Sequence, residues 1–250
     1  MITYLPFIFL GLISGSFLNV LIYRLPLKKS FIFSRSHCPN CKSKIPLYRN
    51  IPIISYLIQF GKCHNCSNKI SLQYPFVESL SAFFWYWGAA NLLSYDAVLF
   101  ILITNILIVI SFIDIKTMEI NIYLVLLSII FLSVYGLFVS ENTSNMLYGS
   151  IVGCGYLGFV FLLTSLIFKK QTMGLGDLQL IIVLGAWIGP GNILVSIFLA
   201  SLFGVIFLVI ANVINKHNKI THLPFAPFLS LSSIITYMMN IDIFNYLIGY

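Results

Sequence analysis

Eight long apolar runs constrain this chain more than any other feature of its sequence. A membrane-spanning helix needs about 20 mostly apolar residues, and these runs lack the apolar–polar alternation that marks a barrel strand. Because only helices and closed barrels satisfy their backbone groups inside a bilayer, we expect an all-α polytopic membrane protein with about eight transmembrane helices. The predicted spans are Tyr4–Tyr23, Pro75–Leu93, Val98–Ile113, Ile120–Val139, Leu147–Phe168, Leu178–Ile188, Ile193–Ile214 and Phe225–Tyr246.

The scarcity of charge excludes a soluble globule. Only 8% of the 250 residues are charged, whereas soluble proteins carry roughly 25%. The first run could be confused with a secretory signal peptide, but no Lys or Arg precedes it and no small-residue cleavage site follows it, which favours a retained helix. The sixth run is short, and Gly189–Asn192 after it predicts a tight turn and allows a shallow or tilted helix.

The basic residues predict the orientation, because Lys and Arg accumulate on the cytoplasmic side. With eight alternating spans, every Lys and Arg falls on one side: nine of the 14 lie between Arg24 and Lys69, and the others are Lys116, Lys169, Lys170, Lys216 and Lys219. We therefore expect both termini outside a bacterial inner membrane and a cytoplasmic segment over 24–74. The net charge of +7 then follows from topology and an anionic inner leaflet, without nucleic-acid binding.

Two Cys-x-x-Cys pairs lie in this polar segment, at Cys38 and Cys41 and at Cys63 and Cys66. Two such pairs about twenty residues apart can close a tetrahedral zinc site, and four protein ligands make such a site structural. The segment is too short to bury a core of its own, so metal binding would supply roughly 10–16 kcal/mol of folding free energy. Cys154, alone in the fifth span, is expected to be an ordinary buried residue.

Other roles for these cysteines are less favoured. Disulfides are disfavoured in a reducing cytoplasm, and no strand–helix–strand pattern surrounds either pair, as a thioredoxin-like redox motif would require. His37 and His64 could each replace a thiolate as a ligand, although solvent-facing neighbours of the site are the simpler interpretation.

Two of the seven acids stand at the cytoplasmic ends of apolar helices. Asp114 follows the unbroken run Ile106–Ile113, and Asp177 opens the sixth span; each alone could also be a helix cap or an interfacial residue. The others are expected in connections or near span ends: Asp96, Glu141 and Asp242 outside, Glu119 after the third span, and Glu78 at the start of the second, where it could pair with a basic residue of the cysteine segment.

As a pair, Asp114 and Asp177 suggest hydrolysis of a peptide bond. One ionised carboxylate takes a proton from water and one protonated carboxyl polarises the carbonyl, and two neighbouring acids share one proton because both cannot ionise. Gly174 and Gly176 would let an extended substrate approach Asp177. Pro224 and Pro227, at the start of the last span, are either a simple helix start or an unwound segment lining a cavity.

Small residues spaced by four predict close helix packing rather than chemistry. These pairs are Gly11 with Gly15, Gly149 with Gly153, and Gly185 with Gly189.

The assembled motifs resemble the bacterial type IV prepilin peptidases, aspartyl proteases of the inner membrane, over essentially the whole chain. The resembling residues are Gly15–Val20, Tyr23–Pro26, the two cysteine pairs, Asn50–Pro52, Ser55–Leu57, Gly61–Cys63, Tyr74, Pro75, Glu78, Asp114, Gly174–Asp177 and Pro224–Phe228.

The resemblance implies that Asp114 and Asp177 are the catalytic aspartates and that the substrate is a prepilin or pseudopilin. Such a substrate has a basic leader, cut after a glycine just before its hydrophobic helix. Many members also methylate the new N-terminal residue with S-adenosylmethionine, an activity associated with the cysteine segment; no Gly-rich nucleotide loop marks a donor site here. The implied division is a first helix (1–23), a zinc-binding segment (24–74) and a peptidase domain (75–250).

Two positions depart from the family pattern. Gln179 stands where lysine commonly follows Gly-x-Gly-Asp, and the stretch Glu119–Asn121 lacks the proline usual after the first aspartate. Two alternatives are a presenilin-like intramembrane protease, which the zinc segment and Gly15–Val20 disfavour, and a proton-coupled transporter, which should show paired repeats and midplane acids.

Overall fold

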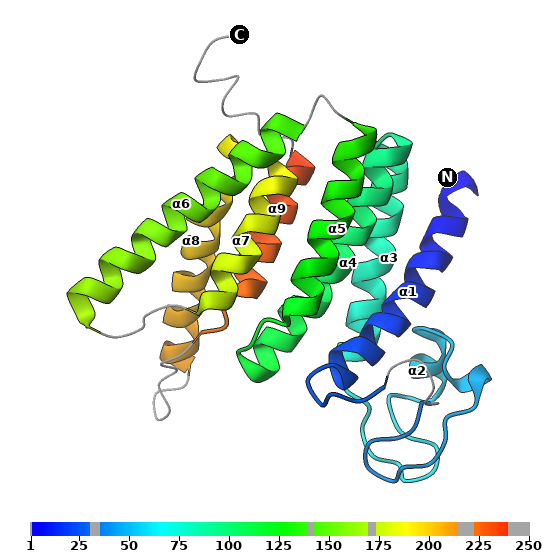
Figure 1. The fold of residues 1–250 in the computed structure, drawn as a ribbon. Coiled ribbons are helices and arrows are strands. Elements are labelled where there is room, and N and C mark those ends of the chain that lie inside the picture. Colours follow the sequence, from blue (N-terminus) through cyan, green and yellow to red (C-terminus); the bar gives the residue numbers. More distant parts are fainter. Residues whose placement is uncertain (1, 31–35, 140–142, 170–173, 215–222, 240–250) are drawn as a thin grey trace. The chain divides into compact units, whose positions relative to one another are not determined.

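The computed structural model describes residues 2–30, 36–139, 143–169, 174–214 and 223–239, and within them the chain is helical apart from turns and two isolated β-bridges (Figure 1). Outside these ranges lie part of the cysteine segment (31–35), Lys170, Lys216, Lys219, Glu141 and Asp242. The helices are α1 (Leu5–Arg24), α2 (Ile54–Ile58), α3 (Gln73–Asn91), α4 (Ser94–Thr117), α5 (Ile122–Phe138), α6 (Thr143–Phe168), α7 (Leu175–Ile188), α8 (Pro190–Ile214) and α9 (Ala226–Met239).

Each of the eight predicted apolar runs corresponds to a helix, from α1 and α3 through to α9. By length and composition, α1, α4, α6 and α8 could cross a membrane, and α5, α7 and α9 are shorter apolar helices. The final prediction, Phe225–Tyr246, extends beyond the described residues after Met239. A helical fold with several candidate membrane spans is therefore confirmed, while the count of eight spans stays a prediction.

The predicted turn at Gly189–Asn192 is shorter than expected. α7 ends at Ile188 and α8 begins at Pro190, so Gly189 alone joins them, with φ of +83°. Glycine adopts positive φ without a steric penalty, and proline suits the first position of a helix. Gly189 is therefore a turn residue, with open space beside its missing side chain. Its backbone also lies close to α6, because a Cβ on Gly149 would be 3.0 Å from the Gly189 carbonyl carbon, which supports the predicted packing role.

The chain forms two compact units, residues 1–109 and 110–250. In the first unit, α1 packs along α3 (Figure 1). The α3 backbone at Ala82 and at Glu78 approaches Gly11 and Gly15 so closely that a Cβ would lie 2.6 Å from it. The predicted packing role of these two glycines is confirmed.

Buried amides reinforce this unit. Asn19 donates to the carbonyl oxygens of Gly15 (3.2 Å) and Tyr74 (3.1 Å), and its own oxygen accepts from Gln73. Asn105 of α4 bonds to Ser81 at 3.1 Å and to Ser14 at 3.1 Å. Such bonds hold helices together where lipid provides no hydrophobic driving force between them.

In the second unit, α7 contacts α5, α6, α8 and α9. Gly149 of α6 faces Gly185 of α7, with the two backbones in direct contact, which confirms the predicted close packing. Between α8 and α9, Ser196 bonds to Ser233 at 2.7 Å and to Ser232 at 3.0 Å. The contacts of α7 with its four neighbouring helices position its first turn, which carries Asp177.

Candidate functional site

Asp114 lies in the last turns of α4, and its side chain is buried, with 5% exposed. Its Oδ2 accepts a hydrogen bond of 3.1 Å from the backbone N–H of Ala226, the first residue of α9. The first N–H groups of a helix have no partner within the helix, so a carboxylate placed there satisfies one of them. This contact fixes the orientation of the Asp114 carboxylate.

Asp177 lies in the first turn of α7 and is partly exposed. Its backbone N–H donates to the Gly174 carbonyl at 3.2 Å, which closes that first turn. The Asp177 and Asp114 carboxylates lie close enough to interact electrostatically. The second unit thus brings the two predicted acids near each other, although 62 residues of sequence separate them.

The two glycines before Asp177 have different surroundings. A Cβ on Gly176 would lie 2.9 Å from Cβ of Ile120, so this glycine is required for the packing of the α7 start. Gly174 is exposed, and a Cβ there would meet chiefly the Asp177 carboxylate, at 3.5 Å. Of the two, only Gly174 leaves open space beside an acid.

The segment with Pro224 and Pro227 lies next to Asp114 in the second unit, through the Ala226 N–H. Pro224 precedes α9, and Pro227 is its second residue; Phe225 accepts from the N–H groups of Phe228 and Leu229, both at 3.1 Å. The structure therefore agrees with the helix-start interpretation of these prolines. The backbone contribution of Ala226 was missed, because an alanine gives no sequence indication of an N–H donor.

The four cysteines of the polar segment form one cluster. Their Sγ atoms all lie within 4.8 Å of one another, with Cys38 and Cys66 at 3.9 Å and Cys41 and Cys63 at 4.0 Å. A tetrahedral zinc with Zn–S bonds of about 2.3 Å needs sulfur atoms about 3.8 Å apart, so the residues fit a metal ion. In the described part of the chain the cluster contains no histidine: neither His37 nor His64 belongs to it.

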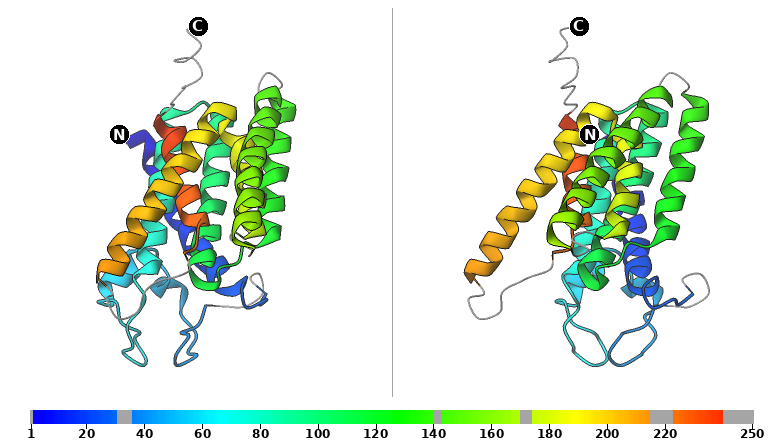
Figure 2. Two further views of the ribbon diagram at one scale, coloured as in Figure 1. Left: turned by 90° about the vertical axis from the view of Figure 1, so that its left-hand side faces the viewer. Right: turned by 60° about the vertical axis from the view of Figure 1, so that its left-hand side comes forward.

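Two equivalent turns build this cluster, and they are the blue and cyan loops of the segment in Figure 2. Cys38 donates its N–H to Ser43 at 2.9 Å, and Cys63 donates to Asn68 at 2.8 Å. The carbonyl oxygens of Cys38 and Cys63 each accept a hydrogen bond of 2.9 Å from the N–H of the residue four positions later. An isolated β-bridge flanks each turn. The shared pattern Cys-x-Asn-Cys-x-x-Lys-Ile could have revealed this duplication from the sequence.

Ser43 also affects the ionisation of the Cys41 thiol. Hydrogen bonds from the Ser43 hydroxyl and backbone lower the pKa of the Cys41 thiol to about 6. Because thiolate is the form that binds metal, this environment favours a ligand role.

Glu78 does not make the predicted pair with a basic side chain among its described contacts. Its Oε2 accepts the backbone N–H of Ile53 at 2.8 Å, and the Ser16 hydroxyl bonds to the same carboxylate. Glu78 is 6% exposed. It therefore ties the cysteine segment to α3 within the first unit.

The stretch Glu119–Asn121 lacks the proline expected after the first aspartate, and Asn121 is the N-cap residue of α5. The Asn121 Oδ1 accepts from the N–H of Tyr123 at 3.0 Å and so caps the helix. Asparagine is among the best N-cap residues, so the start of α5 is stabilised without a proline.

Comparison with known proteins identifies the family to which the chain is related. Residues 9–92 match the model of the bacterial Peptidase A24 N-terminal domain, and residues 101–209 match that of the type IV leader peptidase family. Among similar proteins, the prepilin leader peptidase/N-methyltransferase of Neisseria gonorrhoeae is 32% identical, covering 92% of this chain and 88% of that protein. Proteins of the same name from Legionella pneumophila (30%; 94% and 91% covered) and Pseudomonas aeruginosa (32%; 90% and 86%) are similarly related. No solved structure matches the chain.

Proposed function

Because the chain belongs to the type IV leader peptidase family, we propose that it is a membrane aspartyl endopeptidase which removes the basic leader of prepilins or pseudopilins at the cytoplasmic side and then N-methylates the new N-terminal residue with S-adenosylmethionine. The relatives carry both activities in their names. The observation that supports the peptidase site most directly is that Asp114 lies near enough to Asp177 to act on it electrostatically.

Asp114 and Asp177 share one proton in the proposed cleavage. The ionised carboxylate takes a proton from water, whose oxygen attacks the scissile carbonyl carbon, while the protonated carboxyl donates its proton to the carbonyl oxygen. When the C–N bond breaks, the amine leaves with the proton that the base had taken. The shared proton returns to the pair, and the two acids titrate together.

Methylation follows on the amine that cleavage releases. Its nitrogen lone pair attacks the methyl carbon of S-adenosylmethionine, the electrons of the C–S bond pass to sulfur, and S-adenosylhomocysteine leaves. The methylated nitrogen loses one proton to water. Since cleavage generates the acceptor amine, methylation depends on it.

Zinc is proposed as a structural ion held by Cys38, Cys41, Cys63 and Cys66, since four thiolates leave no open position for a substrate. The proposed organisation is a first transmembrane helix (1–23), this zinc-binding segment (24–74) on the cytoplasmic side, and an intramembrane peptidase domain (75–250). With eight spans, both termini lie outside an inner membrane. Gly174, in open space beside Asp177, is the glycine next to which a substrate backbone would pass.

The test is leader removal by membranes that contain wild type, Asp114→Asn or Asp177→Asn. Each variant should cleave a prepilin at least about 100-fold more slowly, as expected for loss of a general acid or base. Mass spectrometry of the product N-terminus measures both cleavage and methylation. Wild-type cleavage by either variant, at equal expression, would refute the assignment of the pair.

A further inference from the structure

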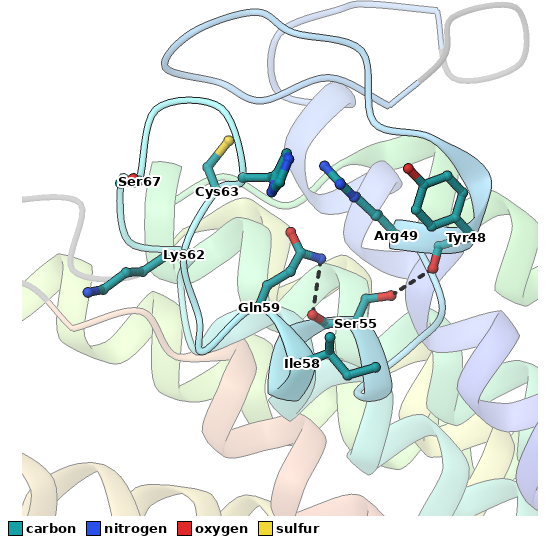
Figure 3. A pocket seen from close by; sticks show the side chains of 9 residues that line it. Tyr48, Arg49, Ser55, Ile58, Gln59, Lys62, Cys63 and Ser67 are labelled. Carbon is teal, nitrogen blue, oxygen red and sulfur yellow. Dashed lines mark hydrogen bonds between the residues drawn. The ribbon is translucent and has the colours of Figure 1, made fainter.

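A pocket of about 510 Å³ lies in the cysteine segment, between the short helix α2, the preceding turn at Tyr48 and Arg49, and the second cysteine loop (Figure 3). Pockets for small molecules and cofactors commonly have about 300–1,000 Å³. We infer that this pocket binds S-adenosylmethionine, with its carboxylate at Arg49, its adenine at Ile58 and Gln59, and its sulfonium toward Cys63. The inference rests on the proposed methyltransferase activity and assigns it a site.

Arg49 is the anion-binding group of the pocket. Its guanidinium lies 5.4 Å from the centre of the Tyr48 ring, and this cation–π contact holds a long side chain in place. Arg49 and Gln59 point toward the same space, whereas the Lys62 ammonium points away from it (Figure 3). Among the described residues that line the pocket none is acidic, so the guanidinium is available to a ligand carboxylate, which it can bind with two parallel hydrogen bonds.

The opposite wall suits a flat heterocycle. Ile58 is 71% exposed and presents bare apolar surface to the pocket. Gln59 donates from Nε2 to the Ser55 carbonyl at 3.0 Å, which fixes the amide plane and turns its oxygen away from that bond. This oxygen can accept a hydrogen bond from the amino group of adenine.

Cys63 supplies the charge that a sulfonium requires, and it lines the pocket as well as belonging to the four-cysteine cluster. With Zn²⁺ bound, four thiolates would leave a net negative charge on the cluster. A ligand with a carboxylate at one point and a sulfonium at another therefore matches the Arg49 and Cys63 sides of the pocket. S-adenosylhomocysteine, whose sulfur is neutral, lacks the second of these attractions.

A constrained turn at Pro52–Ile54 directly precedes α2 and orients the backbone that lines the pocket. Ile53 has φ of +60° and ψ of −52°, a conformation that β-branched residues rarely adopt, and the N–H of Ile54 bonds to the Pro52 carbonyl in a γ-turn. The buried Glu78 accepts the Ile53 N–H at 2.8 Å and so maintains the turn.

Ser55 connects this turn to the pocket walls. Its hydroxyl accepts from the Ile51 N–H at 3.0 Å and donates to the Tyr48 carbonyl at 3.3 Å. Glu78 and Ser55 are therefore positioning residues, because they orient the backbone from which Arg49 and Gln59 extend.

The test is equilibrium binding of S-adenosylmethionine to the full-length, zinc-loaded protein in detergent micelles, by calorimetry. Arg49→Ala should weaken binding about 10- to 100-fold and Gln59→Ala about 3- to 10-fold, as expected for a charged and a neutral hydrogen bond. Lys69→Ala removes an equal charge from an exposed position of the same loop, outside the pocket lining, and should bind within about twofold of wild type. Wild-type affinity in Arg49→Ala, or an equal loss in Lys69→Ala, would overturn the assignment.

Two further comparisons test the sulfonium side and the positioning role. Wild type should bind S-adenosylhomocysteine more weakly than S-adenosylmethionine; equal affinities would remove Cys63 from the proposal. Glu78→Ala and Ser55→Ala should weaken binding of the methyl donor, whereas Glu78→Gln keeps an oxygen for the Ile53 N–H and should restore it. Failure of Glu78→Gln to restore binding, with zinc content normal, would refute the positioning role.

Leader cleavage in the same preparations separates this inference from the proposed function. A wild type that cleaves but neither methylates nor binds the donor would remove the methyltransferase part of the function and the pocket with it. A wild type that methylates, alongside an Arg49→Ala variant that binds the donor normally, would refute the pocket alone.

Discussion

Asp114 Oδ2 accepts a hydrogen bond from the backbone N–H of Ala226, so the last turns of α4 and the first residue of α9 meet at one carboxylate. The proposed catalytic acid is thus also part of the structure of the second unit. Catalytic loss and structural loss can be separated by the choice of substituent.

Asp114→Asn and Asp114→Ala should therefore differ in stability. The asparagine oxygen can still accept the Ala226 N–H, so its thermal unfolding midpoint in detergent should stay near that of wild type. Alanine leaves a buried N–H without a partner, which costs about 1–3 kcal/mol. Both variants should lack leader cleavage, and equal midpoints for the two would show that the hydrogen bond contributes nothing to stability.

Gly176→Ala should destabilise the protein by about 1–3 kcal/mol, because its Cβ would lie 2.9 Å from that of Ile120 and the site is already filled. Thermal unfolding of Gly176→Ala, Gly174→Ala and the double variant Gly176→Ala/Ile120→Ala measures this. Gly174→Ala should remain stable, since Gly174 has no such neighbour. If the double variant were no more stable than Gly176→Ala, the clash with Ile120 would not be the cause of the lost stability.

Gly149→Ala should loosen the α6–α7 contact, again by about 1–3 kcal/mol, since its Cβ would collide with the Gly185 backbone. Gly155→Ala is the matched control on the same helix. Nothing lies within 4 Å of a Cβ at Gly155, so this variant should fall within about 0.5 kcal/mol of wild type. A similar effect of the two substitutions on the unfolding midpoint would argue against the close contact.

Cys38→Ser and Cys41→Ser should lower zinc content, measured by inductively coupled plasma mass spectrometry, and reduce the yield of folded protein. Zinc binding supplies much of the folding free energy of so small a segment, and a chelator should have the same effect on wild type. Cys154 lies on α6, outside the four-cysteine cluster, so Cys154→Ser should retain the metal. Full zinc content in Cys38→Ser would exclude it as a ligand.

The helices could be predicted because a long apolar run in a bilayer must satisfy its backbone hydrogen bonds within the segment. A helix does this whatever its neighbours are. The proximity of Asp114 and Asp177 was also expected from the sequence, since Asp114 lies at the end of one apolar helix and Asp177 at the start of another, on the same predicted side. The link between Glu78 and Ile53 could not be predicted. It joins a carboxylate to a backbone N–H, and a backbone N–H has the same chemistry at every residue except proline.

Gly176 shows a second reason why part of the site could not be predicted from the sequence. A glycine next to a proposed catalytic acid suggested access for a substrate, yet the space beside it belongs to Ile120, more than fifty residues earlier in the chain. Only the packed structure shows whether the space beside a glycine is open to a ligand or filled by a neighbouring side chain. The duplication of the cysteine turns, in contrast, was visible in the sequence as a repeated motif.

Because Gly189 alone joins α7 to α8, the length of α7 determines how far Asp177 lies from this joint. From Gly189 to Asp177 the helix rises by about 18 Å, and each inserted or deleted residue would shift Asp177 by about 1.5 Å and turn it by about 100° around the axis. The joint has no slack to absorb such a change, and Gly185 fixes the same helix against α6. The number of residues in α7, as much as their identity, therefore determines where the carboxylate of Asp177 is placed.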